Sequence, residues 1–201
     1  MAEEIIDIVD EKDNIIGQEG RDVCHKKGLR HRIVGIFLFN AAGKLWLQTR
    51  SAKKASGKKL DFSASGHVGQ GDAYDNAALR ELREELGVTA TLSFLGKIYY
   101  EKNKGDHHSR HFLAIYEGKH NGPFLLQEEE VEKIEAYDLG AVKKLVEEDS
   151  QRITFGLKTG VKYFVNQNSK VNRESPKQEN GEKTRRGQKD FYRSDILPEE
   201  R

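Results

Sequence analysis

The feature that most constrains this chain is a glycine-rich segment followed by a short amphipathic helix with three glutamates. Residues 66–72 read GHVGQGD, and apolar residues recur at helical spacing through 75–86, up to a glycine that favours helix termination. Glu81, Glu84 and Glu85 occupy positions i, i+3 and i+4, so their carboxylates share one helix face. Three close negative charges repel one another unless a hard cation such as Mg²⁺ or Mn²⁺ binds them. An acidic cluster alone is often a solvated surface, but the glycine-rich entry favours a metal site here.

The full segment resembles the signature of the Nudix hydrolases, G-x5-E-x7-R-E-U-x-E-E-x-G-U, where U is aliphatic. Every fixed position matches except the first glutamate, where this chain has Asp72. The resemblance implies an α/β (α+β) fold, an α/β/α sandwich around a mixed β-sheet with a loop–helix–loop catalytic motif. By position, Glu81, Glu84 and Glu85 resemble the catalytic ligands of Mg²⁺ (or Mn²⁺). Arg80 resembles the catalytic arginine that orients them through ion pairs, and Asp72 is a possible further metal ligand.

The remaining pattern predicts mostly strands, with helices after the glutamate segment. The expected strands cover residues 5–9, 15–17, 33–40, 44–50, 60–65, 89–101, 111–117 and 133–137, and the expected helices cover 75–86, 139–148 and 153–165. Residues 33–40 form a nearly continuous apolar run, typical of a central strand buried on both faces. Asp75 is the expected N-cap of the glutamate helix, and the polar residues 102–110 are expected to form a loop.

Composition indicates one folded domain with an extension. Only 36% of the residues are hydrophobic and 33% are charged, so part of the chain is expected to lie outside the core. We predict a Nudix domain over residues 1–165 and a charged tail without regular structure over 166–201. The apolar residues of the tail that could dock are Phe191, Tyr192, Ile196 and Leu197.

Charge and cysteine content limit the expected partners and compartment. Lys and Arg total 34 against 33 Asp and Glu, so the net charge of +1 gives no global reason to expect a nucleic acid or a membrane as partner. The single cysteine, Cys24, excludes an intramolecular disulfide, and no apolar run approaches the length of a membrane span. We therefore expect a cytoplasmic protein. The Nudix resemblance implies an enzyme that acts on a small-molecule diphosphate substrate, and the protein could form a homodimer.

A second resemblance, over about residues 4–145, is to the isopentenyl-diphosphate isomerase branch of the same superfamily. It rests on DIVDEKDNIIG near the N-terminus, CHKKGLRHR from residue 24, LQTRSAKK from residue 47 and SGH from residue 65. In the isomerases, histidines similar to His25, His31 and His67 join two strand glutamates around a metal. The resemblance therefore makes these three histidines possible metal ligands in this chain.

Two positions separate this chain from the isomerases. Ser65 stands where their proton-transferring cysteine lies, and Ser109, Arg110 and His111 stand where they carry a Glu-x-Glu pair. A hydroxyl is a poor substitute for a thiol in proton transfer at carbon. Because the glutamate helix is complete, we predict a Mg²⁺-dependent hydrolase that cleaves the diphosphate bond of a nucleoside-diphosphate derivative or another small organic diphosphate. An isopentenyl-diphosphate delta-isomerase and a catalytically silent ligand-binding module are the alternatives.

Further side chains are candidates for contact with the substrate. Arg50 and Lys54 resemble the basic pair that grips the diphosphate in the isomerase branch, and their cationic groups suit such a ligand. A further glutamate often acts as base in this family, and the candidates are Glu128, Glu129, Glu130, Glu132 and Glu135. The neighbouring histidines either line the substrate mouth or face solvent, with solvent favoured; they are His107, His108 and His111.

Overall fold

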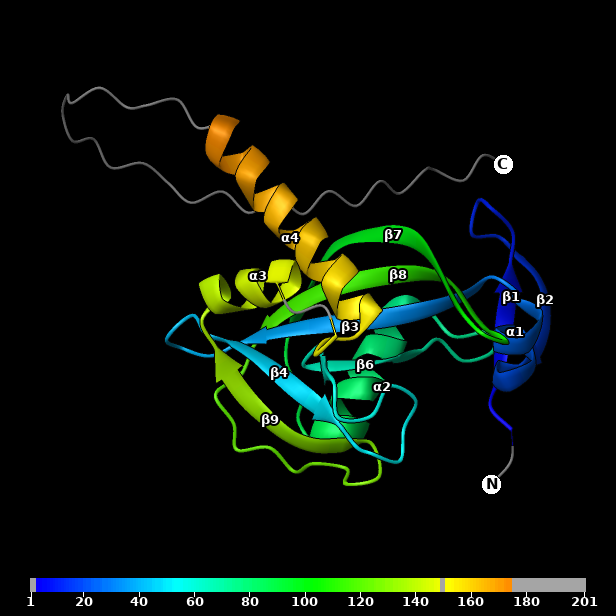
Figure 1. Ribbon diagram of the computed structural model, residues 1–201, viewed down its shortest axis with the longest axis horizontal. Helices are drawn as coiled ribbons and strands as arrows, with labels where there is room; N and C mark the ends of the chain where they lie inside the picture. Colours follow the sequence, from blue (N-terminus) through cyan, green and yellow to red (C-terminus); the bar gives the residue numbers. More distant parts are fainter. Residues whose placement is uncertain (1–2, 149–150, 175–201) are drawn as a thin grey trace, which may run out of the picture.

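Nine strands form one mixed sheet with helices on both faces in the computed structural model, which describes residues 3–148 and 151–174 (Figure 1). The strands are β1 (Ile5–Val9), β2 (Ile15–Gly20), β3 (His31–Phe39), β4 (Leu45–Arg50), β5 (Leu60–Asp61), β6 (Ala64–His67), β7 (Leu92–Lys104), β8 (His107–Lys119) and β9 (Val131–Tyr137). The helices are α1 (Arg21–Lys27), α2 (Tyr74–Leu86), α3 (Leu139–Glu148) and α4 (Phe155–Glu174).

Strand β3 is the centre of the sheet, as its apolar sequence predicts. Strand β8 runs parallel along one edge of β3, with His31 beside His111 at the start of the pairing. The other edge pairs antiparallel with β1, β6 and β4 in turn. Because β3 has neighbours on both edges and helices over both faces, Val34, Ile36 and Leu38 are fully buried.

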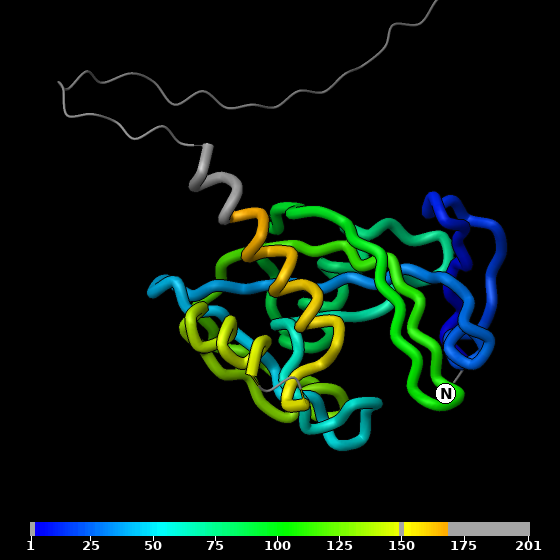
Figure 2. Tube along the Cα trace, turned by 45° about the horizontal axis from the view of Figure 1, so that its top comes forward, coloured from blue at the N-terminus to red at the C-terminus, as the bar shows by residue number. Residues whose placement is uncertain are grey.

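Side chains alternate along the strands, so the two faces of the sheet pack against different helices. One core, between the sheet and α2, contains Val34, Ile36, Leu38, Ala77, Ala78, Leu82 and Leu86. The other core, between the sheet and the pair α3 and α4, contains Phe37, Leu113, Ile115, Val142, Val146, Leu157 and Val161. Figures 1 and 2 show α2 on one side of the sheet and α3 with α4 on the other. The predicted α/β/α sandwich around a mixed sheet is therefore confirmed.

Helix α2 ends where the sequence predicts but is capped differently. Gly87 has a φ of 66°, a left-handed conformation that glycine adopts without strain. At the other end the N-cap is Ala73, without a side-chain cap hydrogen bond, so the N-cap role predicted for Asp75 is wrong. The Asp75 carboxylate instead accepts a hydrogen bond from the Tyr116 hydroxyl on β8, which ties the first turn of the helix to the sheet.

Strands β7 and β8 form a longer hairpin than the sequence predicts. The predicted loop over residues 102–110 is strand except at a short turn, because the two polar segments pair as far as Lys104 with His107. Ladder hydrogen bonds satisfy backbone groups whatever the side chains are. The end of this hairpin lies beside α1, a helix that the sequence did not predict (Figure 2). Arg110 Nη1 donates a hydrogen bond to Gly28 O, just after this helix, at 3.2 Å.

Helix α4 extends beyond the domain boundary predicted at residue 165. It runs from Phe155 to Glu174 and buries Leu157 and Val161 in the second core. The remainder of the predicted tail, 175–201, lies outside the described residues, as do the apolar residues Phe191, Tyr192, Ile196 and Leu197. Among the described helices, none combines the length and apolarity needed to cross a membrane.

We expect Leu157→Ala to lower the free energy of unfolding by about 2–5 kcal/mol, because it creates a cavity between α4 and the sheet. Leu157 is fully buried, whereas Lys162 is exposed on the same helix. Lys162→Ala is therefore the matched control, with an expected change below about 0.5 kcal/mol. Urea unfolding followed by circular dichroism measures both values. Equal effects would show that α4 does not pack on the sheet as described.

Candidate active site

The glutamate face of α2 borders a cavity of about 720 Å³, a size usual for small-molecule sites. Glu81 and Glu85 are buried beside it, whereas Glu84 is exposed. The other walls come from α1, the segment after β4, strands β6, β7 and β8, the residues before β9 and the start of α4. Segments that are far apart in the sequence therefore meet around the predicted glutamates.

Glu85 is fixed by two hydrogen bonds from neighbouring strands. Gln48 Nε2 on β4 and the backbone N of Ser65 on β6 both donate to Glu85 Oε2, each at 2.9 Å. Burial, followed by the nearby charge of Glu81, raises the pKa of Glu85 well above its usual range. The two neutral donors orient the carboxylate but supply no positive charge to balance it.

Glu81 lies directly against strand β6. A side chain at position 66 would overlap the Glu81 carboxyl group, so Gly66 is the residue that allows this approach. Arg80 Nη1 lies 2.8 Å from Glu81 Oε1. Burial nevertheless raises the pKa of Glu81 to about 7, with the Arg80 charge acting in the opposite direction. The first glycine of the motif thus makes room for a buried carboxylate.

Arg80 connects the helix to the glycine-rich segment. Its Nη1 lies 2.9 Å from Glu84 Oε2 as well as close to Glu81. Its Nη2 donates a hydrogen bond to the backbone O of His67 at 2.8 Å. Because the guanidinium is planar and rigid, these contacts fix the distance between α2 and β6. The ion pairs are those that the sequence predicts for Arg80.

Glu81, Glu84 and Glu85 could together hold a divalent cation. Burial is the main cause of the raised pKa of both Glu81 and Glu85, which shows that negative charge at this position lacks local compensation. A hard cation with oxygen ligands would supply that compensation. Asp72 is not among the residues that line the cavity, and its Oδ1 accepts a hydrogen bond from the backbone N of Ala73 at 2.9 Å.

Arg50 and Lys54 line the same cavity, as a diphosphate-binding role requires. Arg50 Nη1 pairs with Asp61 Oδ2 at 2.9 Å, and Arg50 Nε donates to the backbone O of Ala55 at 3.0 Å. Lys54 Nζ pairs with Glu130 Oε1 at 2.7 Å. Each cation is therefore positioned by a carboxylate beside the space that an anionic ligand would occupy.

Glu130 is distinguished from the other four candidate glutamates by its place in the cavity wall. Burial is the first cause of the raised pKa of Glu81, and the charge of Glu130 adds to it. The glutamates that are not among the lining residues are Glu128, Glu129, Glu132 and Glu135. Which of the five glutamates lines the cavity depends on the path of the chain before β9. Residue types alone do not reveal that path.

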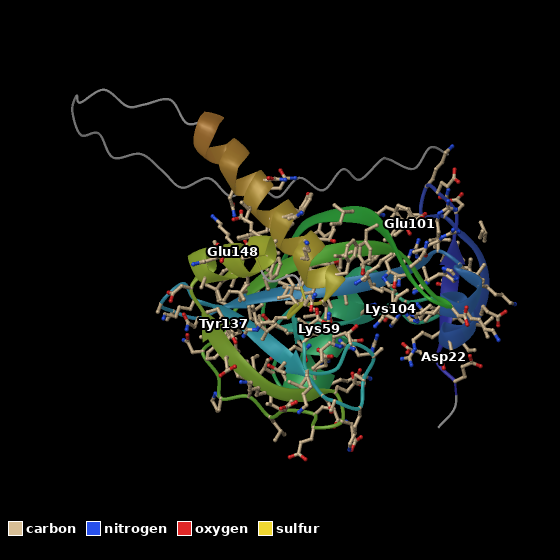
Figure 3. The ribbon with its side chains drawn as sticks, viewed as in Figure 1. Asp22, Lys59, Glu101, Lys104, Tyr137 and Glu148 are labelled. Atoms are coloured by element: carbon tan, nitrogen blue, oxygen red, sulfur yellow. The ribbon has the colours of Figure 1, made fainter. Side chains whose placement is uncertain are left out.

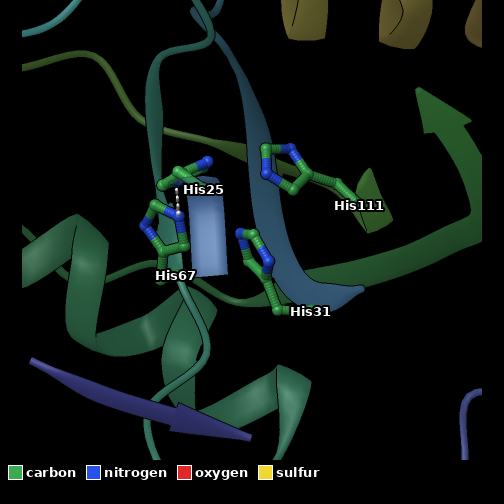
Figure 4. A group of neighbouring side chains, drawn as sticks. All are labelled: His25, His31, His67 and His111. Atoms are coloured by element: carbon green, nitrogen blue, oxygen red, sulfur yellow. Dashed lines mark hydrogen bonds between the residues drawn. The ribbon is translucent and has the colours of Figure 1, made fainter. Parts of the chain in front are cut away.

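Four histidines gather beside the cavity. One ligand nitrogen from each of His25, His31, His67 and His111 lies within 4.8 Å of all the others (Figure 4). Strand register explains the meeting, because His31 pairs with His111 on β8 and Ile33 pairs with His67 on β6. Three imidazoles thus share one face of the sheet, and α1 brings His25 to them.

The solvent exposure predicted for His111 is wrong. This residue is 6% exposed and lines the cavity, because it begins the buried half of β8. The apolar run that follows it, residues 112–116, is the signal that could have indicated burial. His107 is exposed but also lines the cavity, and its ring stacks on His25 with centroids 4.2 Å apart.

The outer part of the cavity is charged. Asp22 on α1 and Lys104 at the end of β7 line it, and Figure 3 shows the two side chains near the junction of α1 with the hairpin. Further cations in the lining are Arg21, Lys53 and Lys102. These basic groups give an anionic ligand a favourable route toward the glutamates.

Comparison with known proteins agrees with this geometry. The NUDIX domain family matches residues 29–155, more than half of the chain. An uncharacterized Nudix hydrolase of Streptomyces coelicolor is 38% identical over 133 residues, which cover 65% of this chain and 72% of that protein. Isopentenyl-diphosphate Delta-isomerase 1 of Aromatoleum aromaticum is 30% identical over 159 residues, which cover 78% of this chain and 89% of the isomerase.

Solved structures share the fold of this chain. A crystal structure of a Deinococcus radiodurans protein matches with a TM-score of 0.66 and 25% identity, covering 79% of this chain and 98% of that chain. A MutT protein from Methanosarcina mazei Go1 matches in fold with a TM-score of 0.58, 17% identity and coverage of 69% and 95% of the two chains. The chain therefore belongs to the NUDIX family, and its relatives include proteins named as hydrolases and as isomerases.

We expect Glu81→Gln to stabilise the cation-free protein increasingly as the pH rises. The pKa of Glu81 is about 7 in the folded chain against an ordinary value of 4.5, so between these values the folded state keeps a proton that the unfolded state has lost. The free energy of unfolding of the wild type therefore falls relative to that of Glu81→Gln as the pH rises through this window. The total fall is roughly 3 kcal/mol. The histidines titrate in both proteins, so their contribution cancels in the difference.

Chemical unfolding of both proteins in EDTA, at about pH 5 and pH 8, measures this difference. Glu84→Gln is the matched control, because Glu84 is exposed on the same helix. A difference between Glu81→Gln and the wild type that does not change with pH would contradict the burial of the Glu81 charge.

Proposed function

We propose that this chain is a Mg²⁺-dependent (or Mn²⁺-dependent) hydrolase that cleaves the diphosphate bond of a nucleoside-diphosphate derivative or another small organic diphosphate. The observation that carries the proposal is the buried pair Glu81 and Glu85, facing a cavity that Arg50 and Lys54 also line. Two buried like charges need a proton or a cation to compensate them. The basic side chains suit a diphosphate, whose oxygens would meet a cation at the glutamates.

The chemistry divides between the cation and the protein. A divalent cation held by Glu81, Glu84 and Glu85 would neutralise the phosphate oxygens, make an attacking water more acidic and stabilise the leaving oxygen. The protein supplies orientation, because Arg80 holds the glutamates against β6. The Arg50 guanidinium is suited to contact two phosphate oxygens at once.

Glu130 is the described glutamate best placed to accept a proton from the attacking water. It lines the cavity, and Lys54 Nζ holds its Oε1 at 2.7 Å. A general base must lie within hydrogen-bond reach of the proton that it removes, and its place in the cavity wall supports Glu130 in this role. Lys54 would then have two roles, to attract the diphosphate and to hold the base.

Isomerisation is the second candidate, because the named isomerase of Aromatoleum aromaticum aligns with most of this chain. That reaction adds a proton to one carbon and removes a proton from another, so it needs an acid and a base of matched strength. Ser65 and Ser109 line the cavity where the resemblance expects a thiol and a carboxylate. Neither hydroxyl has the acidity or basicity for those roles near neutral pH, which favours hydrolysis.

A panel of diphosphates with Mg²⁺ tests the reaction class. Hydrolysis would release inorganic phosphate or a nucleoside monophosphate, whereas isomerisation in D₂O would place deuterium in isopentenyl diphosphate. We expect release of product without incorporation of deuterium. Incorporation above the level of a Glu84→Gln variant would overturn the hydrolase proposal in favour of the isomerase. The absence of both products would favour a catalytically silent module.

We expect Glu84→Gln and Glu85→Gln each to lower kcat by at least about a hundredfold, because each removes charge that binds the cation. Arg83→Gln is the control on the same helix, since Arg83 is exposed and its Nε donates a hydrogen bond to the backbone O of Leu79 on that helix. Its kcat should remain near that of the wild type. Turnover like that of the wild type by either glutamate variant at saturating Mg²⁺ would remove this helix face from the reaction.

We expect Glu130→Gln to lower kcat by about a hundredfold, the usual contribution of a general base, with little change in the Mg²⁺ concentration needed for activity. Glu135→Gln is the matched control, because Glu135 is not a lining residue and pairs with Lys133 at 2.7 Å. Equal activity of the two variants would exclude Glu130 as the base.

A further inference from the structure

We propose that Lys102 and Lys104 form a second anion-binding subsite, which takes a phosphate group carried by the organic part of the substrate. This inference rests on the proposed function, because that function assigns the diphosphate to Arg50, Lys54 and the glutamates. It adds a substrate class, the organic diphosphates that bear one further phosphate monoester. The subsite lies on the hairpin of β7 and β8, which forms another part of the cavity wall.

One face of this hairpin leads from the interior of the cavity to solvent. Side chains two residues apart share a strand face, so Tyr100, Lys102 and Lys104 form a row along β7. Their partners on β8 are, in that order, His111, Ser109 and His107. All six residues line the cavity, and the row extends over about 13 Å from the half-buried Tyr100 to the exposed Lys104. A ligand that reaches outward from the glutamates would therefore lie along this row.

Lys102 and Lys104 differ from the other basic side chains of the cavity wall, because they have no carboxylate partner. Neither ammonium group forms an ion pair with any residue in 3–148 or 151–174. The other basic groups of the wall each pair with a carboxylate, and they are Arg21, Arg50, Lys53, Lys54 and Arg80. Since a close carboxylate offsets much of the field of a cation, the two unpaired lysines attract an added anion more strongly.

Positive charge accumulates around Lys102. Its Nζ lies 5.0 Å from the centre of the Phe155 ring, which holds the ammonium group beside the first turn of α4. Burial lowers the pKa of Lys102, and the charges of Lys59, Lys104 and Lys158 lower it further. None of these four lysines forms an ion pair within the described part of the chain. A bound anion would relieve their repulsion, as a cation would at the glutamates.

The polar groups of the row suit a phosphate. A phosphate monoester has a charge of about −1.5 to −2 near pH 7, which two ammonium groups can balance. Ser109 is paired with Lys102 across the hairpin and offers a hydroxyl that can donate to a phosphate oxygen. Two carboxylates, Asp22 and Asp106, border the outer end beside Lys104 and weaken its attraction for an anion. Lys102 is therefore the principal contact.

Binding of inorganic phosphate to the full-length protein, followed by ¹H–¹⁵N NMR, tests the subsite without turnover. EDTA removes divalent cations, so the glutamates repel phosphate, and low ionic strength limits the screening of the exposed lysines. We expect the backbone amide signals of residues 101–104 and 107–110 to shift together and to saturate as phosphate is added. Lys102→Gln should abolish this saturable binding, Lys104→Gln should weaken it less, and Lys102→Arg should retain it.

Lys119→Gln is the matched control, because Lys119 is exposed at the other end of β8 and is not a lining residue. It should bind phosphate as the wild type does. Three results would overturn the proposal. They are shifts confined to residues 50–59, shifts that do not saturate, and unchanged phosphate binding by Lys102→Gln.

NADPH and NADH are a matched pair of substrates, since both contain a diphosphate and they differ by one phosphate on a ribose. We expect kcat/KM with Mg²⁺ to be about tenfold higher for NADPH, through a lower KM, as a charged hydrogen bond would give. Lys102→Gln should lose this preference and Lys119→Gln should keep it. Equal values of kcat/KM for the wild type would overturn the substrate class. If neither compound is cleaved, the result counts against the proposed hydrolase, and the phosphate titration decides the subsite.

Discussion

The close approach of helix α2 to strand β6 is the constraint on which the site depends. Gly66 leaves space for the Glu81 carboxyl group, and the backbone N of Ser65 donates to Glu85. The result is two buried carboxylates side by side, a state that favours the proton or a cation over free charge. Arg80 offsets only part of that charge while it joins the helix to the strand. The helix therefore packs well and still buries negative charge that a proton or a cation would compensate.

The fold brings carboxylates and imidazoles to the same cavity from different elements. The α2 side of the sheet supplies carboxylate oxygen, whereas the histidines of β3, β6 and β8 lie together with α1 beside the same cavity. His67 belongs to the histidine cluster through its ring and to the glutamate motif through its backbone O, which accepts from Arg80.

The family relationship fixes the fold more firmly than the reaction. Proteins named as Nudix hydrolases and as isopentenyl-diphosphate isomerases both align with this chain, so similarity to this chain does not by itself select one reaction. This chain differs from the isomerases at a few residues that line the cavity. Ser65 and Ser109 offer hydroxyls there, and His111 offers an imidazole that is buried beside three others. These residues, rather than the fold, favour the proposed hydrolase over the isomerase.

The sequence by itself determined the features that depend on local spacing. The shared face of Glu81, Glu84 and Glu85 follows from the helical repeat, and the end of α2 follows from the left-handed preference of Gly87. The apolar run of β3 likewise predicted a central strand. Tertiary structure decided the features that depend on pairing between segments far apart in the sequence. The register of β8 on β3 buried His111 beside His31, and the path of the chain into β9 placed Glu130 in the cavity wall. Register and chain path are set by the whole sheet and its two cores, so no short window of sequence contains them.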